Sequence, residues 1–326
     1  MTSRTAVIGA GLAGLSCART LRLAGHYVEI FEEDRIIGGR MGTMRVGVVP
    51  YDHGAQYVTT RSARFRQYVD ELVGTGYATP WSPRMTAGSS GTEAVTASGW
   101  YVGVPGMSSL VRPLAESVRI HTGKTAHTIS KVGKGWTIWF DDQTTAGPYA
   151  AVAIAVPAPR ARLLLGPLTD MAEHISRVRM GPCWALLARL DERTLPEPDV
   201  YSDMSEVIRW VARNNTKPGR ASRGETIVVH ASPGWSRETE DVEPDVVAGE
   251  LWGEVSHVLG LPPVRPTVMT AHLWRTGLVE QALGEMYVYS TEHRVGVAGD
   301  WCFGRLAEHA FESGQALAKA IVGSLD

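Results

Sequence analysis

Apolar and polar positions follow a pattern that predicts α/β elements at the start of the chain. Residues 5–8 form a short apolar run typical of a buried strand, and apolar residues then recur at helical spacing over about 13–23. A second strand is expected over 27–31, ending at Glu32, and a second helix over 61–73. Because two strands joined by a crossover helix pair in parallel, the first three elements predict a βαβ unit.

The middle of the chain is rich in strands, and its end returns to the α/β pattern. Further strands are expected over residues 118–120, 125–132, 136–140, 150–156 and 295–298. Region 181–274 reads as strands with one helix near 245–259, and Gly299-Asp300-Trp301 reads as a turn before a helix over about 307–322. This interleaving predicts two domains, each built from separated segments: 1–75, 104–160 and 290–326 for the first, 76–103 and 161–289 for the second.

The composition is that of an ordinary soluble protein. Apolar residues make up 44% and charged residues 20% of the 326 positions, and the formal net charge of −2 gives no reason to expect nucleic acid or an anionic membrane as partner. Three cysteines, Cys17, Cys183 and Cys302, are too widely spaced for a disulfide framework or a C-x-x-C metal site. No apolar run approaches membrane-spanning length, and glycines split the first one, unlike a secretory signal. We expect a cytoplasmic protein without a metal.

The clearest motif is a glycine run between the first strand and the first helix. Gly9, Gly11 and Gly14 match G-x-G-x-x-G, in which the first glycine permits a tight turn, the second lets the backbone approach a pyrophosphate, and the third lets helix and strand pack closely. The helix N-terminus stabilises phosphate charge. Glu32 ends the second strand, where a carboxylate can accept hydrogen bonds from an adenosine ribose. Together these features predict a dinucleotide site.

Two further segments favour FAD over NAD. Gly38-Gly39-Arg40-Met41 resembles the G-G-R segment of flavin-containing amine oxidases, where the arginine compensates pyrophosphate charge. Gly299-Asp300 before a helix resembles the second flavin-contact segment of that superfamily, which implies that Asp300 binds ribityl hydroxyls and that the helix N-terminus faces the flavin. We predict non-covalent FAD, with Cys302 an inert buried thiol. The expected cofactor-binding residues are Gly9, Gly11, Gly14, Glu32, Gly39, Arg40, Met41, Gly54, Gln56, Tyr57, Asp300 and Ala307.

Within this superfamily the chain most resembles the bacterial renalases, over nearly its whole length. The resemblance lies in segments 38–41, 54–57, 105–108, 210–214, 217–220, 229–231, 235–236, 299–302 and 313–314. It implies an α/β fold in which an FAD-binding Rossmann-like domain carries a discontinuous, mostly antiparallel β substrate domain, as in p-hydroxybenzoate hydroxylase and the amine oxidases. Segments 85–98 and 278–280 depart from the resemblance, and both are candidates for lining the substrate cavity.

The resemblance also implies a reaction and a substrate. Renalases pass a hydride from the 2-dihydro and 6-dihydro isomers of NAD(P)H to flavin, and oxygen then yields hydrogen peroxide, so a dinucleotide and oxygen are the expected small-molecule partners. The alternatives are a flavin amine oxidase, which needs an aromatic cage for a neutral amine, and a non-catalytic FAD-containing dinucleotide-binding protein.

The candidate catalytic residues are Tyr57, His230 and Trp274. His230 lies in an apolar strand, so it either faces the flavin or is a core histidine, and Trp210 and Trp274 are either cavity walls or core. Tyr57, like Gln56, directly continues a flavin-contact segment.

Overall fold

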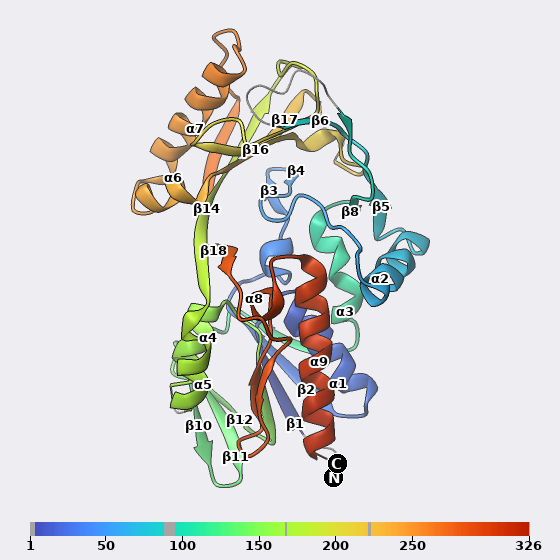
Figure 1. The fold of residues 1–326 in the computed structure, drawn as a ribbon, viewed down its shortest axis with the longest axis vertical. Coiled ribbons are helices and arrows are strands. Elements are labelled where there is room, and N and C mark those ends of the chain that lie inside the picture. Colours follow the sequence, from blue (N-terminus) through green and yellow to red (C-terminus); the bar gives the residue numbers. More distant parts are fainter. Residues whose placement is uncertain (1–3, 88–94, 167, 221–222, 326) are drawn as a thin grey trace.

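Most strands of this protein belong to two large sheets stacked along the long axis of the molecule (Figure 1). The computed structural model describes residues 4–87, 95–166, 168–220 and 223–325. The described part of the chain begins and ends at the lower end of the molecule (Figure 1). In the described part of the chain, no helix is both long and apolar enough to cross a membrane.

The first sheet has six strands in the order β19-β20-β13-β1-β2-β9. All run parallel except the edge strand β19, which is antiparallel to β20. The strands are β1 (Arg4–Ile8), β2 (Tyr27–Glu32), β9 (Arg119–Thr122), β13 (Ala151–Ile154), β19 (Val288–Ser290) and β20 (Val295–Val297). The sheet therefore joins segments far apart in the sequence, as the interleaved pattern predicts, although the predicted domain limits themselves stay a prediction.

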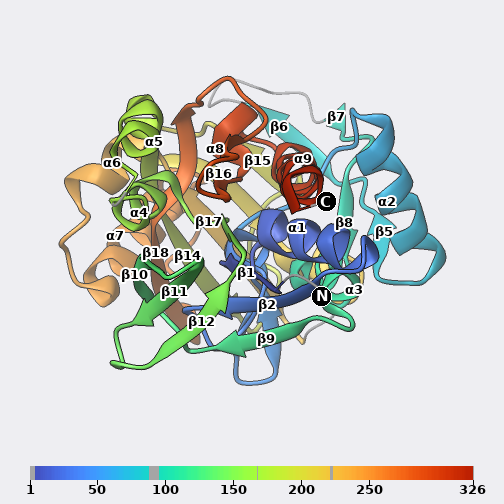
Figure 2. The ribbon, with the colours of Figure 1, turned by 90° about the horizontal axis from the view of Figure 1, so that it is seen from below.

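Both faces of this sheet are covered, which explains the unbroken apolar run of β1. Helices α1 (Leu12–Leu23) and α9 (Ala307–Leu325) cover one face, and the antiparallel strands β10 (Ala126–Val132), β11 (Gly135–Phe140) and β12 (Thr145–Tyr149) cover the other (Figure 2). Because side chains alternate along a strand, Val7 packs into the helical layer while Ala6 and Ile8 pack against the β10–β12 layer.

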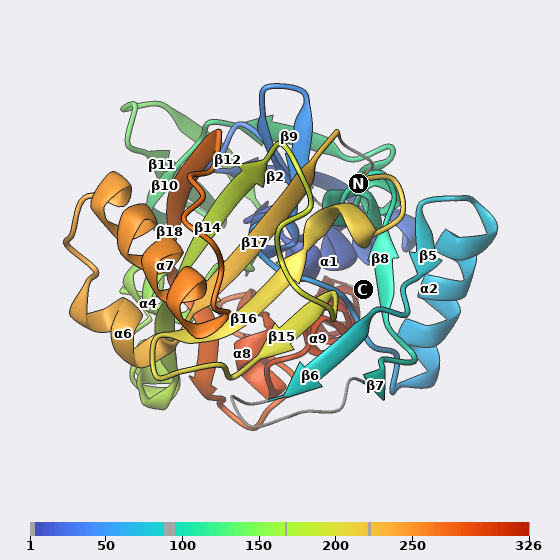
Figure 3. The same ribbon diagram turned by 90° about the horizontal axis from the view of Figure 1, so that it is seen from above.

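The second sheet has seven strands in the order β18-β14-β17-β16-β15-β6-β7. It is antiparallel except where β6 pairs in parallel with β15. Helices α6 (Pro233–Glu238) and α7 (Pro244–Val258) lie along its outer face (Figure 3). The strands are β6 (Arg84–Ala87), β7 (Val95–Thr96), β14 (Arg179–Leu190), β15 (Val200–Ser202), β16 (Ile208–Arg213), β17 (Glu225–Ala231) and β18 (Val268–Gln281).

Smaller elements connect the sheets. Two antiparallel pairs are formed, one by β3 (Met44–Val46) with β4 (Val49–Tyr51) and one by β5 (Ala78–Pro80) with β8 (Tyr101–Gly103). The remaining helices are α2 (Ala63–Gly74), α3 (Arg112–Ala115), α4 (Ala158–Leu164), α5 (Thr169–His174) and α8 (Asp300–Phe303), with 3-10 turns at Gly39–Met41, Met107–Leu110, Ile175–Arg177 and Asn214–Thr216.

Two sequence-based expectations about local structure are wrong. Gly299-Asp300-Trp301 is not a simple turn, because α8 begins at Asp300 and is closed by a hydrogen bond from Gly304 N–H to the Asp300 carbonyl (2.7 Å). Region 181–274 contains a second helix, α6, capped by Ser232, whose hydroxyl accepts from the Trp235 N–H (3.2 Å). Both helices are short, so neither has enough turns to show a helical period in the sequence.

Candidate functional site

The three glycines of the G-x-G-x-x-G run meet different constraints. Gly9 has φ of +100°, and a Cβ on Gly14 would lie 1.9 Å from the Gly9 carbonyl oxygen, so the local packing itself requires both glycines. Gly11 has φ of −75°, and a Cβ there would meet nothing within 4 Å. The protein itself therefore leaves room for a Cβ at Gly11. The smallness of this residue is therefore explained by a ligand that approaches its backbone, as the motif predicts.

Glu32 lies beside this loop at the end of β2. It is buried, and its carboxylate accepts hydrogen bonds from Ala10 N–H (2.6 Å) and Asp34 N–H (3.0 Å). Burial raises the pKa of Glu32 above its usual value, against the lowering effect of these two hydrogen bonds. The structure thus places Glu32 next to the glycine loop, and a carboxylate has further lone pairs with which to accept from ribose hydroxyls.

The second glycine pair is joined to the first loop. Gly38 N–H donates to the Ala10 carbonyl (2.9 Å), and Gly38 forms an isolated bridge with Gly11. Gly39 and the buried Met41 are the ends of a 3-10 turn. A Cβ on Gly54 would lie 2.1 Å from the Arg40 carbonyl oxygen. Segments 38–41 and 54–57 therefore pack against each other and against the glycine loop, although far from it in sequence.

Arg40 and Asp300 form a bidentate ion pair with N–O distances of 2.8 and 2.6 Å. The resemblance gave these residues separate tasks, charge compensation for Arg40 and hydroxyl binding for Asp300. The structure instead brings them together, so each carboxylate oxygen already has a guanidinium donor. Asp300 is buried, and the pair ties the N-terminal flavin segment to α8 near the C-terminus.

The C-terminal helix is held tightly against the first helix. Ala307 is the first residue of α9, and a Cβ on Gly314 would lie 2.1 Å from the Ala13 carbonyl oxygen. Ser313 accepts a hydrogen bond from Gly299 N–H (2.9 Å). Burial raises the pKa of the Cys302 thiol, which is fully buried, and so favours its protonated form.

Behind the 52–57 segment lies a buried ionic cluster that we call the Asp52 cluster: Asp52, Lys217 and Arg220. All three side chains have 0% exposure. One Asp52 oxygen accepts from Arg220 Nε (3.0 Å), Arg220 Nη2 (2.7 Å) and Lys217 Nζ (3.2 Å); the other accepts from Thr43 Oγ1 and Met107 N–H (both 2.9 Å). Burial alone would raise the pKa of Asp52, but the two cations and the hydrogen bonds hold it below its usual range.

The Asp52 cluster carries one more positive than negative charge. Arg220 with Thr43 and Met107 already satisfies the carboxylate, so Lys217 is the surplus cation. Its ammonium also donates to Gln56 Oε1 (3.0 Å) and lies 5.3 Å from the centre of the Trp81 ring. Burial lowers the pKa of Lys217 to about 8, against the opposing effect of Asp52.

Next to this cluster, His230 and Trp274 meet at one backbone carbonyl. The carbonyl oxygen of His53 accepts from Trp274 Nε1 (3.0 Å) and lies 3.1 Å from His230 Nε2. The His53 ring packs 4.8 Å from Trp274 and 4.9 Å from His272. Burial lowers the pKa of His53 and of His230 to about 4 each, so both rings are neutral at physiological pH. The structure therefore brings two of the three candidate catalytic residues together.

The third, Tyr57, belongs to an aromatic group. Its ring stacks on Trp100 with centroids 3.7 Å apart, and Trp210 lies 5.8 Å from Tyr57 and 5.9 Å from Trp100. Trp210 is a half-buried member of this aromatic group, and its buried Nε1 has no hydrogen-bond partner within the described residues. Because Tyr57 and Trp100 are in direct contact, nothing can be held between their faces. Segment 88–94, part of a predicted cavity wall, lies outside the described residues.

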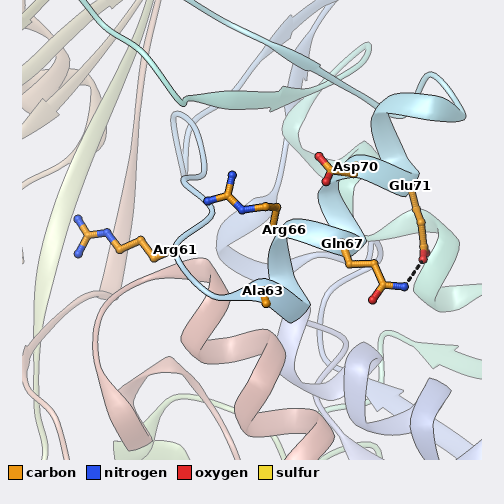
Figure 4. Close-up of a pocket in the computed structure, with 6 residues that line it drawn as sticks. All are labelled: Arg61, Ala63, Arg66, Gln67, Asp70 and Glu71. Carbon is orange, nitrogen blue, oxygen red and sulfur yellow. Dashed lines mark hydrogen bonds between the residues drawn. The ribbon is translucent and has the colours of Figure 1, made fainter.

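A separate surface cleft of about 670 Å³ opens at the start of α2 (Figure 4). Its two arginines, Arg61 and Arg66, are balanced by Asp70 and Glu71, and Arg66 donates to the Thr60 carbonyl (2.6 Å). The cleft therefore has neither the surplus charge nor the aromatic walls found around the Asp52 cluster.

Sequence reasoning assigned no role to Asp52, His53, Lys217, Arg220 or His272. Asp52 and His53 directly precede the predicted 54–57 flavin segment, and Lys217 and Arg220 lie inside a segment that carries the renalase resemblance. The presence of charged residues in these segments was the sequence feature that could have indicated a functional cluster. Their convergence was hidden because about 160 residues separate the two segments.

Comparisons with known proteins agree with this geometry. Residues 7–72 match the NAD(P)-binding Rossmann-like domain, and residues 84–322 match the flavin containing amine oxidoreductase model. A Mycobacterium tuberculosis protein provisionally named a flavin-containing monoamine oxidase is 48% identical over 52 residues, 16% of this chain and 12% of that protein. The L-amino-acid oxidase of Crotalus adamanteus is 36% identical over 69 residues, 21% of this chain and 13% of that protein. These matches thus span only a small part of either relative.

Solved structures are similar over the whole chain. Cyclohexylamine oxidase from Brevibacterium oxydans has a TM-score of 0.79 at 14% identity and covers 100% of both chains. Putrescine oxidase bound to putrescine has a TM-score of 0.70 at 14% identity, over 99% of both chains. At such low identity these similarities establish the fold alone.

The site fits a flavin dinucleotide. The open backbone at Gly11, the Glu32 carboxylate beside it and the joined 38–41 and 54–57 segments lie together at the carboxyl ends of β1 and β2, where this class of sheet binds dinucleotides. The family model covers well over half of the sequence. The chain belongs to the flavin-containing amine oxidoreductase family, and its cofactor is FAD.

Proposed function

We propose that this protein oxidises the 2-dihydro and 6-dihydro isomers of NAD(P)H to NAD(P)⁺, as a renalase-type oxidase. FAD, when bound, supplies the two-electron acceptor, and oxygen regenerates it with release of hydrogen peroxide. The substrate partners in this proposal are a dinucleotide and oxygen. We also expect non-covalent FAD and a cytoplasmic location.

The observation that carries the proposal is the charge of the site. In the Asp52 cluster two cations surround one fully occupied carboxylate. Arg209 adds positive charge nearby: it opposes the rise that burial causes in the pKa of Tyr57 and adds to the lowering that burial causes in the pKa of His230. An amine substrate reaches the enzyme mainly as an ammonium ion, which this surplus positive charge disfavours. A dinucleotide is anionic, and its dihydropyridine ring is neutral, so the same charge favours it.

The chain's own residues have limited work to do in such a reaction. A dihydropyridine carries no proton that must be removed before it loses a hydride, so no base is required. Tyr57, His230 and Trp274 then act by orienting a planar ring and by excluding water. This role suits neutral imidazoles and aromatic side chains.

An amine oxidase remains the main rival, because the family and the named solved structures include amine oxidases. It requires space between aromatic rings for a neutral amine. The stacked Tyr57 and Trp100 leave none between them, which favours the dinucleotide proposal. The second rival, a non-catalytic FAD-containing protein, predicts no reduction by any substrate.

The deciding experiment mixes the FAD-loaded protein anaerobically with each substrate class and follows flavin absorbance. We expect rapid bleaching with the 2-dihydro or 6-dihydro isomers of NAD(P)H, and much slower bleaching with ordinary 4-dihydro NAD(P)H, cyclohexylamine or putrescine. Faster bleaching by an amine would overturn the proposal in favour of the amine oxidase, and no bleaching by any compound would support the non-catalytic alternative.

A further inference from the structure

His230 lies in a row of residues that crosses the inner face of the seven-stranded sheet. His230 is on β17, where it is paired with Trp210 on β16 at one side and with Ala185 on β14 at the other. Ala185 is paired in turn with His272 on β18. Directly paired residues of adjacent strands point to the same face. The small Ala185 separates the two imidazoles, so neither is covered by the side chain between them.

The opposite face of this sheet is closed by helices. Val229 and Ala231, the neighbours of His230 on β17, are buried in a core that includes Leu251 and Val255 of α7. His230 is itself partly exposed. It therefore faces away from the helical core and toward the 52–57 segment, where the flavin and substrate residues are expected.

The hydrogen bonds around His230 determine which ring nitrogen carries the proton. The His53 carbonyl oxygen, 3.1 Å from Nε2, can only accept, so Nε2 donates. Gln56 is no competing acceptor, although its Nε2 lies 3.4 Å away. Gln56 Oε1 accepts a hydrogen bond from Lys217, and Gln56 Nε2 donates to the Asp52 carbonyl oxygen (2.5 Å). The Gln56 atom nearest His230 is therefore an amide nitrogen, which is a donor like His230 Nε2.

The other ring nitrogen, Nδ1, is consequently a bare acceptor. A neutral imidazole has one N–H, and burial lowers the pKa of His230 to about 4, so the ring is neutral. Within the described residues no donor is hydrogen-bonded to Nδ1. The nearby donors Trp274 Nε1 and His230 Nε2 both donate to the His53 carbonyl oxygen. His230 Nδ1 is not enclosed by the described residues, so the N–H group of a ligand in the site can reach it.

We propose that His230 selects the carboxamide group of the substrate ring, with Nδ1 accepting a hydrogen bond from the amide N–H. This inference rests on the proposed function, because the dihydropyridine ring of these NAD(P) isomers carries that carboxamide on C3, next to the reacting carbon of the 2-dihydro isomer and across the ring from that of the 6-dihydro isomer. His230 is then a specificity-determining residue. Substrates whose ring substituent has a carbonyl but no N–H lose the interaction.

The test compares 6-dihydro-NAD with the 6-dihydro form of its 3-acetylpyridine analogue, in which a methyl group replaces the amide nitrogen. We expect the parent protein to prefer the carboxamide by about tenfold in kcat/KM for flavin reduction, the effect of one neutral hydrogen bond whose loss leaves an acceptor unpaired. The oxidised dinucleotides, titrated against the oxidised protein by the change in flavin absorbance, should show a similar ratio of Kd values.

Two matched variants separate the two ring nitrogens. Asn places its side-chain oxygen about as far along the side chain as Nδ1, so His230→Asn should retain most of the carboxamide preference. Gln reaches instead to the position of Nε2, so His230→Gln should reduce the ratio to about one. FAD content and circular dichroism of both variants establish that they are folded and loaded.

The outcomes distinguish this inference from the proposed function. If 6-dihydro-NAD reduces the flavin but the preference is absent, or is unchanged in His230→Gln, the inference is wrong while the proposed function stands. If neither dihydropyridine reduces the flavin, the proposed function is wrong and the inference falls with it.

Discussion

Replacing Asp52 with Asn is expected to destabilise the fold severely. The change removes the one negative charge from a cluster in which Lys217 and Arg220 are fully buried, so two cations remain in the interior without a counter-ion. Removing one partner of a buried ion pair typically destabilises a protein by about 3–5 kcal/mol. Such a loss is a large part of the roughly 5–15 kcal/mol that stabilises an ordinary domain.

The measurement is equilibrium unfolding of the FAD-loaded protein in guanidinium chloride, followed by tryptophan fluorescence and circular dichroism. Asp70→Asn is the matched control, because Asp70 is exposed on α2 and no ion pair of Asp70 occurs within the described residues. We expect the control to change the free energy of unfolding by less than about 0.5 kcal/mol.

The surplus cation provides a second check on the same reasoning. Lys217→Met removes a buried charge that Asp52 does not need, so it should be much less harmful than Asp52→Asn. Added to Asp52→Asn, it should recover about 1–3 kcal/mol, because one of the two unpaired cations is gone. An Asp52→Asn variant within about 1 kcal/mol of the parent, or no recovery in the double variant, would refute the electrostatic account of this cluster.

The pH dependence of stability follows from the same lysine. Its pKa is about 8 in the folded protein and 10.5 in an unperturbed lysine. Between these values the unfolded chain binds more protons than the folded one, so the contribution of Lys217 makes the free energy of unfolding rise with pH. The full difference is about 3 kcal/mol. Subtracting the pH profile of Lys217→Met from that of the parent isolates this rise, and an identical slope in both would contradict it.

Three further outcomes are expected. Gly11→Ala should fold like the parent, since its Cβ meets only open space, but should bind FAD more weakly. Gly14→Ala should lower the melting temperature, because its Cβ would overlap the Gly9 carbonyl. Thermal unfolding with and without added FAD separates the two effects. Glu32→Ala should weaken FAD binding by about one to two decades, the effect of losing hydrogen bonds of roughly 1.5–3 kcal/mol to a charged group. Ultrafiltration of the loaded protein measures FAD retention, and a variant that retains FAD as well as the parent would contradict this prediction. His230→Ala and Tyr57→Phe should each slow flavin reduction by 6-dihydro-NAD less than about 10²-fold, the lower limit of general-base catalysis. The reduction rate should be nearly flat between neutral and mildly alkaline pH, because burial lowers the pKa of His230 to about 4. A stopped-flow reduction rate that rises steeply with pH, also in Lys217→Met, would indicate a catalytic base.

Local chemistry in the sequence was sufficient to predict FAD as the cofactor and the glycine loop with Glu32 beside it. The glycine run, the strand before it and the helix after it are contiguous, so their geometry follows from short-range sterics and hydrogen bonding. The same holds for Glu32 at the end of β2 and for the alternation that buries β1 on both faces. Gly14 is needed by its own loop, and such a requirement can be read from a motif.

The ionic cluster and the state of His230 were decided only by the tertiary structure. Asp52 meets Lys217 and Arg220 across about 160 residues, and Arg40 meets Asp300 across 260, so no local pattern connects them. Strand alternation left His230 equally consistent with core and cavity, because periodicity does not say which face of a sheet a helix will cover. Packing of α7 against one face places His230 on the other face, toward the 52–57 segment, and the His53 carbonyl then determined which imidazole nitrogen remained free. Charge and protonation depend on what burial brings together, and for that reason they are properties of the folded chain.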